Sequence, residues 1–241
     1  MRNSLLILIT IALIAAEVTE SRAAMEIAGR VESLTGKVTA HRAQGQEALA
    51  AGSTLFVNDR MLTGRDGSAE IVFVDGSRMK VAANANIRIL AYDYDAKQKI
   101  RHALISMTSG KARFLVKDLE QFNEQGFRVQ TETAIVASQN TDFIVSYDPE
   151  LPRDEVCRNG LTNAFCVEHC ILVYSLPFQD KPVLLTANMI SQVCGPAWPT
   201  PPRFITAAEL ARILAGLDRI GNAENPPPEK TQKSSGCLPG S

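Results

Sequence analysis

The residues best suited to chemistry are the five cysteines of the second half of the chain: Cys157, Cys166, Cys170, Cys194 and Cys237. Clustered cysteines form disulfides in an oxidising compartment. The surrounding segments have the pattern of a hairpin that turns near Gln179 and Asp180. Such a hairpin places Cys166 opposite Cys194, so we predict this pair, together with Cys157–Cys170. Cys237 would be left over or would bond to another molecule.

A Zn²⁺ site is the alternative use of the same cluster, with Cys166, His169, Cys170 and Cys194 as ligands. Tetrahedral zinc needs its ligands on one side of the chain. His169 and Cys170 are adjacent, and neighbouring residues of a strand point to opposite faces. We therefore favour disulfides over a metal and expect no cofactor, although four cysteines allow three pairings.

A second candidate site is the run Tyr92-Asp93-Tyr94-Asp95. Asp93 and Asp95 would share one face of a strand, where they could flank an ion or a sugar. Glycosidases use paired carboxylates, but no acid partner can be named here. These four residues are the candidate groove for an envelope carbohydrate such as peptidoglycan, although a solvated rim explains the pair more simply.

The sequence contains none of the common enzyme motifs. It has no G-x-S-x-G elbow, no H-E-x-x-H pair, and no Walker or dinucleotide glycine pattern. The net charge of −1 gives no basic footprint for nucleic acid. With 241 residues, of which 45% are hydrophobic, the chain can form one sizeable core or two small domains. We expect a protein that is not an enzyme and has no nucleic-acid partner.

The elements that position these residues follow an expected export signal over residues 1–23. Arg2 precedes the apolar run Leu5–Ala16, and small residues flank Arg22. This is the pattern of a secretory signal peptide. The apolar run is shorter than the ~20 residues of a membrane span. We expect a periplasmic or secreted protein with no stable membrane span after cleavage.

Residues 24–202 are expected to form a mainly β domain. Apolar and polar residues alternate in Gly29–Val38 and Ser68–Val74, and Asp75-Gly76 follows as a hairpin signal. Asp66-Gly67 gives a second turn of the same kind. Short strands with weak internal echoes favour a solenoid-like, coiled stack over a two-sheet sandwich.

Residues 203–221 are predicted to contain one amphipathic helix. Thr206 and Glu209 form a capping box, and Gly221 would end the helix. This helix could dock on its own domain or on a partner. Residues 222–241, with three consecutive prolines, are predicted to be a disordered tail. The apolar stripe of the helix is formed by Leu210, Ile213, Leu214 and Leu217.

Several segments together resemble the FecR domain family, over roughly residues 27–202. The resemblance rests on Arg60–Gly64, on Gly67–Ser77 with its Asp-Gly-Ser sequence, on Val129–Phe143 and on Val183–Asn188. The sequence departs from the family pattern in three places. Asn58-Asp59 stands where the family has Gly-Asp, and Asn140 and Cys170 each stand where glycine is usual.

The resemblance implies a β-rich, solenoid-like periplasmic module without catalytic residues. FecR-like regulators couple an outer-membrane receptor to a cytoplasmic sigma factor. We do not expect that role here, because the domain begins a few residues after the signal peptide. We expect an exported module that binds another envelope protein through strand edges or the helix, with peptidoglycan binding as the alternative.

Overall fold

The computed structural model describes residues 25–119, 121–122, 124–151, 157 and 159–217. The expected signal peptide, residues 1–23, and the expected tail, residues 222–241, lie outside the described residues.

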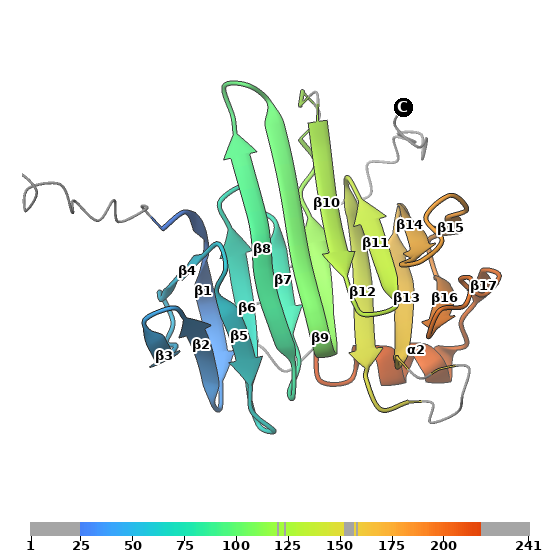
Figure 1. Ribbon diagram of the computed structural model, residues 1–241, viewed down its shortest axis with the longest axis horizontal. Coiled ribbons are helices and arrows are strands. Elements are labelled where there is room, and N and C mark those ends of the chain that lie inside the picture. The colour runs from blue at the N-terminus through green and yellow to red at the C-terminus, as the bar shows by residue number, and fades with distance from the viewer. Residues whose placement is uncertain (1–24, 120, 123, 152–156, 158, 218–241) are drawn as a thin grey trace, which may run out of the picture.

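The strands form two layers, which we name sheet A and sheet B (Figure 1). Sheet A has the strand order β4 (Thr54–Phe56), β1 (Ile27–Thr35), β6 (Ser68–Phe73), β7 (Arg78–Val81), β9 (Ile100–Val116), β12 (Thr141–Asp148), β13 (Leu161–Glu168), β16 (Met189–Cys194) and β17 (Arg203–Phe204). Sheet B has the order β3 (Gly45–Ala48), β2 (Val38–Arg42), β5 (Arg60–Thr63), β8 (Asn86–Asp95), β9, β10 (Glu124–Gln130), β11 (Ala134–Ser138), β14 (Cys170–Ser175) and β15 (Val183–Thr186).

Strand β9 belongs to both sheets. Its first part, residues 100–109, pairs with β8 and β10 in sheet B. Its last part, residues 110–116, pairs with β7 and β12 in sheet A. The change occurs at Gly110, whose φ of +97° favours glycine, and a Cβ atom there would overlap Ala85. Gly110 thus lets one strand cross from one layer to the other.

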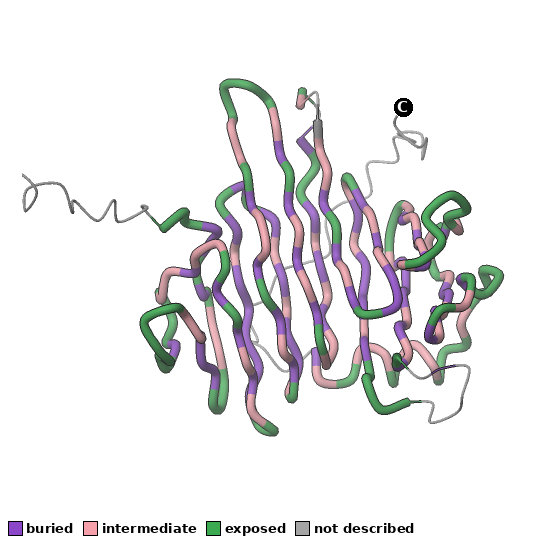
Figure 2. Tube along the Cα trace, in the orientation of Figure 1, coloured by how far each residue is buried: buried purple, intermediate pink, exposed green. Residues whose placement is uncertain are grey.

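One hydrophobic core lies between the layers. Phe127 of sheet B lies with its ring centroid 5.8 Å from Phe114 and 6.4 Å from Phe143, both in sheet A. Phe73 of sheet A stacks at 4.5 Å on Tyr92 of sheet B. Buried and more exposed residues alternate along these strands, as Figure 2 shows. This alternation is expected of strands with one face on a shared core.

The prediction of a mainly β protein is confirmed, whereas the solenoid-like stack is not. A solenoid stacks its coils as parallel neighbours. Among the described strands, β9–β10 is the single parallel pairing, and the rest are antiparallel. Asp75-Gly76 forms the expected β6–β7 hairpin. Asp66-Gly67 does not, because the strands on either side, β5 and β6, lie in different sheets.

Helix α2 spans Ala207–Leu214 and begins at Thr206 with the predicted capping box. The predicted bounds, 203–221, were too wide. Arg203 and Phe204 form strand β17, and the helix ends at Leu214, two residues before Gly216 with its φ of +85°. The chain therefore leaves the helix at an earlier glycine than Gly221.

Candidate functional site

The apolar face of α2 packs against its own domain. Leu217 is 1% exposed and belongs to a cluster with Ile144, Phe165 and Ile190 on the outer face of sheet A. The other members of the predicted stripe, Leu210, Ile213 and Leu214, pack against this cluster. The stripe that we considered as a partner surface thus packs on the protein's own sheet, where Leu217 is buried and the other three residues are half-buried.

Polar contacts fix both ends of this helix. The Lys111 ammonium donates hydrogen bonds to the carbonyl oxygens of Ile213 and Ala215, both at 2.7 Å, close to the negative end of the helix dipole. At the other end, Arg203 pairs with Glu209 at 2.7 Å. The hydrogen bond from Arg203 and those from Thr206 lower the pKa of Glu209 to about 2. The helix is thus held by its apolar face and by both termini.

An open groove of about 250 Å³ lies between α2 and the outer face of sheet A. Its sheet side carries Ser146, Asn163 and Gln192, and its helix side carries Glu209 and Arg212. Sequence reasoning missed this groove, because its residues come from segments far apart in the chain.

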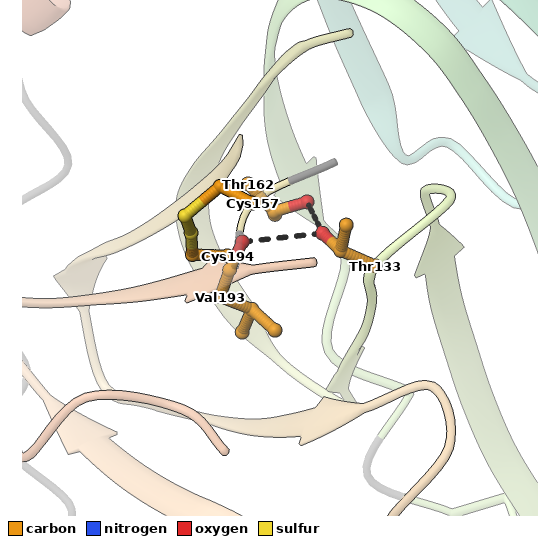
Figure 3. The surroundings of a disulfide bond; sticks show 5 residues. All are labelled: Thr133, Cys157, Thr162, Val193 and Cys194. Atoms are coloured by element: carbon orange, nitrogen blue, oxygen red, sulfur yellow. Dashed lines mark hydrogen bonds between the residues drawn. A yellow bond between two sulfur atoms is a disulfide. The ribbon is translucent and has the colours of Figure 1, made fainter. Parts of the chain in front are cut away.

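The cysteines pair differently from the prediction. Cys157 bonds to Cys194, as Figure 3 shows, and Cys166 is free and buried. Cys170 is disulfide-bonded too, but to neither Cys157 nor Cys166. Both predicted pairs were wrong because the expected single hairpin is divided between the sheets. In β13–β16, Cys166 faces Met189 and Cys194 faces Leu161.

The alternative zinc site is also not assembled. Cys194 is already bonded to Cys157, and Cys166 is buried apart from it in the register of β13 and β16. Across the described residues, no group of three or more His, Cys, Asp or Glu side chains could bind a metal ion. Burial, with Asp142 and Glu168 nearby, raises the pKa of the Cys166 thiol to about 12.

Buried threonines lie beside the disulfide. The hydroxyl of Thr162 is 2.6 Å from that of Thr131 and 2.6 Å from that of Thr133. Thr133 also donates to the carbonyl oxygen of Val193, next to Cys194 (Figure 3). Hydrogen bonding satisfies these buried hydroxyls and joins the Thr131–Thr133 turn to β13 and β16. This explains the threonine pattern by which the segment resembles FecR.

The run from Tyr92 to Asp95 does not form one groove. Tyr92 is 1% exposed and points into the core. Asp95 accepts hydrogen bonds from the amides of Lys97 and Gln98, as turn aspartates do. Tyr94 stacks on Phe122 at 5.7 Å. Three of the four side chains therefore have separate structural roles, and Asp93 is exposed.

The Asp-Gly-Ser sequence organises a buried ionic network instead. Asp75 accepts hydrogen bonds from the Ser77 amide and from the Tyr92 hydroxyl, both at 2.8 Å. Arg101 donates to the same carboxylate at 3.0 Å, and both charged side chains are fully buried. Burial, followed by the charge of Asp75, raises the pKa of Tyr92 well above its ordinary value. The network joins sheet A to sheet B.

The edge strands of the two sheets each have a neighbouring strand on one side, so within the described residues their other side presents backbone N–H and C=O groups without a partner strand. Edge strand β3 is exposed, polar and charged at Glu47, β4 has three residues, and β17 has two residues that follow a pair of prolines. Strand β15 differs, because its sequence is Val-Leu-Leu-Thr and Leu184 is 41% exposed. Charges, prolines and short length protect edges from pairing. Strand β15 is also short and follows Lys181-Pro182, but its own four residues carry no charge and no proline. It is therefore the most apolar edge of the described sheets.

Aromatic side chains lie on the loops beside β15. Phe178, in the loop that leads into β15, stacks on Trp198 at 4.6 Å. The Lys181 ammonium lies 5.3 Å from the centre of the Trp198 ring. Trp198 and Phe178 are 43% and 38% exposed. This end of the molecule thus combines an apolar edge strand with exposed aromatic rings.

Fold and edges define a two-sheet β protein with an open edge strand and a docked helix. Residues 59–158 match the family described as FecR protein, which confirms the resemblance seen in the sequence. Among curated proteins, none matches the chain. Within the described residues, no helix is long and apolar enough to span a membrane.

Two crystal structures of a candidate anti-sigma factor from Parabacteroides distasonis ATCC 8503, at 1.65 and 2.50 Å resolution, are similar to this chain. The sequence identity is 19% in both cases, and the TM-scores are 0.47 and 0.46. The similarity covers 65% and 64% of this chain, and 65% and 63% of those chains. The chain therefore spans slightly less than two thirds of the protein that it resembles.

Proposed function

We propose that this protein is an exported, non-enzymatic FecR-like module that binds a protein partner by strand addition to β15. The observation that carries the proposal is the apolar edge of sheet B at Leu184. A strand added there would bond to backbone groups along β15 and would cover Leu184. The match to FecR over residues 59–158 supports a role in signalling through protein contacts.

The location of the protein is part of the same proposal. Residues 1–23 have the sequence pattern of an export signal. The Cys157–Cys194 disulfide is of the kind that persists in an oxidising compartment such as the periplasm. We propose that the partner is an envelope protein that presents an extended segment with an apolar residue opposite Leu184.

A crosslinked pull-down from the envelope of the source cell tests the proposal, with three versions of the chain compared at equal amount. The versions are wild type, Leu184→Lys and Val74→Lys. Val74 is 42% exposed, close to the 41% of Leu184, but lies in the turn after β6. We expect a specific protein that the wild type and Val74→Lys retain and that Leu184→Lys loses.

Retention of that protein by Leu184→Lys would overturn the assignment to β15. Thermal unfolding of all three versions accompanies the pull-down, because a lysine on an exposed position should leave the melting temperature nearly unchanged. Recovery of cell-wall fragments without a protein would overturn the proposed function as a whole.

A further inference from the structure

A hydrogen-bonded row of polar side chains crosses the sheet side of the groove. Ser146, Asn163 and Gln192 lie opposite one another on β12, β13 and β16. Gln192 donates to the side-chain oxygen of Asn163 at 2.6 Å, and Asn163 donates to the Ser146 hydroxyl at 3.2 Å. Each amide keeps one further N–H for a ligand, and the Gln192 side-chain oxygen can accept. The row thus forms a preorganised amide surface.

Of the three cations that line the groove in the described part of the chain, two already have partners. Lys111 donates to carbonyl oxygens at the end of α2, and Arg203 is paired with Glu209. Arg212 uses its Nε to donate to the Ala208 carbonyl oxygen at 3.3 Å. No carboxylate of the described residues pairs with Arg212. Its guanidinium can therefore donate hydrogen bonds to the carboxylate of a ligand.

The apolar base and the small volume of the groove restrict which ligands it can hold. Ile144, Phe165 and Ile190 line its base beside the polar row. A volume of about 250 Å³ is below that of pockets for drug-sized ligands. An occupant must therefore be small, with a carboxylate, an amide and a short apolar side chain.

We propose that this groove binds the carboxyl terminus of a peptide. The terminal carboxylate pairs with Arg212, the last peptide group bonds to Asn163 and Gln192, and a small side chain lies on Ile190. The groove is on the outer face of sheet A, whereas the proposed partner strand adds to β15 of sheet B. The two proposals concern different surfaces and can therefore be tested independently.

Calorimetric titration of the full chain tests the proposal with three probes: N-acetyl-dialanine, its C-terminal amide, and acetate. We expect saturable binding of the acid, with the amide and acetate each weaker by about tenfold or more, because a charge-assisted hydrogen bond or the peptide contacts are lost. Equal binding of acid and amide, equal binding of acid and acetate, or no saturable binding would overturn it.

Three variants locate the binding. Arg212→Gln should weaken binding of N-acetyl-dialanine by about tenfold, and Gln192→Leu should weaken it measurably. Arg128→Gln is the matched control, because Arg128 is an exposed arginine of β10 in sheet B. Far-ultraviolet circular dichroism and thermal unfolding show whether each variant is folded. Unchanged affinity in a folded Arg212→Gln would contradict the proposed site.

Discussion

Asp75 and Arg101 form an ion pair with no exposed side-chain surface. Removing both charges from water is costly, and the cost is offset only while each group keeps its partners. Arg101 also donates to the carbonyl oxygens of Lys117 and Gln139, and Asp75 accepts from Ser77. The pair therefore affects stability chiefly when one partner is removed, because the other charge then stays buried without its partner.

Substitution Asp75→Ala should therefore destabilise the protein by about 3–5 kcal/mol, because it leaves the Arg101 charge buried without its carboxylate. Urea unfolding followed by circular dichroism measures this loss. Glu32→Gln is the control, since Glu32 pairs with Arg30 at the surface and should cost at most about 1 kcal/mol. Equal effects of the two substitutions would show that the buried pair has no special importance.

Cys166 should be unreactive in the native protein. Its pKa is raised to about 12, chiefly by burial, and thiols react as thiolates. We expect no modification by iodoacetamide at pH 8 in native conditions and complete modification in guanidinium chloride. Peptide mapping without reduction should then find alkylated Cys166 and a linked Cys157–Cys194 peptide. Rapid native labelling would contradict the buried position of the thiol.

Glu209 gives the docking of α2 a dependence on acid pH. Its pKa is lowered from 4.5 to about 2 by hydrogen bonds from Arg203 and Thr206, so the folded state favours the carboxylate. Its stabilising contribution is complete above about pH 4.5 and is lost as the pH falls through 2. Amide resonances of α2 followed by NMR from pH 6 to 2 should report this loss.

The Glu209→Gln variant is the control for that titration. It removes the titrating group while keeping hydrogen-bonding atoms, so the α2 resonances should no longer change between pH 4.5 and 2 in the way the wild type does. An identical acid response in wild type and variant would assign the transition to other carboxylates.

The C-terminal end of helix α2 is held by a lysine of another element. The Lys111→Met variant removes the hydrogen bonds to the carbonyl oxygens at the end of the helix and keeps most of the side-chain volume. We expect hydrogen exchange of the α2 amides to accelerate by about tenfold or more. Exchange in β10 and β11 should not change. Lys37→Met, at an exposed turn lysine, is the control.

Among the secondary-structure elements, the sequence correctly predicted those features that depend on residues close together in the chain. The capping box of Thr206 and Glu209 involves residues three apart and was recognised correctly. The Asp75-Gly76 hairpin was also local. The pairing of Cys157 with Cys194 was missed, because it depends on which strands cross between the sheets. Local patterns fix turns and caps, whereas the register between distant strands is decided by the shared core.

The candidate site was less predictable than the fold for the same reason. Arg101 has no motif that marks it as the partner of Asp75, which lies 26 residues away. The groove joins β12, β13 and β16 to α2. The stripe around Leu214 was identified, but periodicity alone does not say whether such a stripe packs on its own domain or on another protein.

For the whole molecule, the continuous core predicts that the FecR-matched span does not fold alone. Residues 59–158 include β6 and β12 but lack their neighbours β1 and β13. Of the 34 described residues that are buried in the core, 12 lie outside this span and would be missing. Four of the described ladders would lose a strand: β1–β6, β2–β5, β12–β13 and β11–β14. We expect the 59–158 fragment to show poor NMR dispersion and no cooperative thermal transition, and the full chain to show a single one. A well-dispersed fragment spectrum would contradict this.

Strand β9 also determines how the molecule resists mechanical force. It is paired on both sides in sheet B and again on both sides in sheet A. Tension applied along β9 would load the hydrogen bonds with its neighbours in shear, all at once. A force on β15 would instead open its single ladder with β14 one bond at a time. The protein is therefore stiff along its shared strand and peels from its apolar edge.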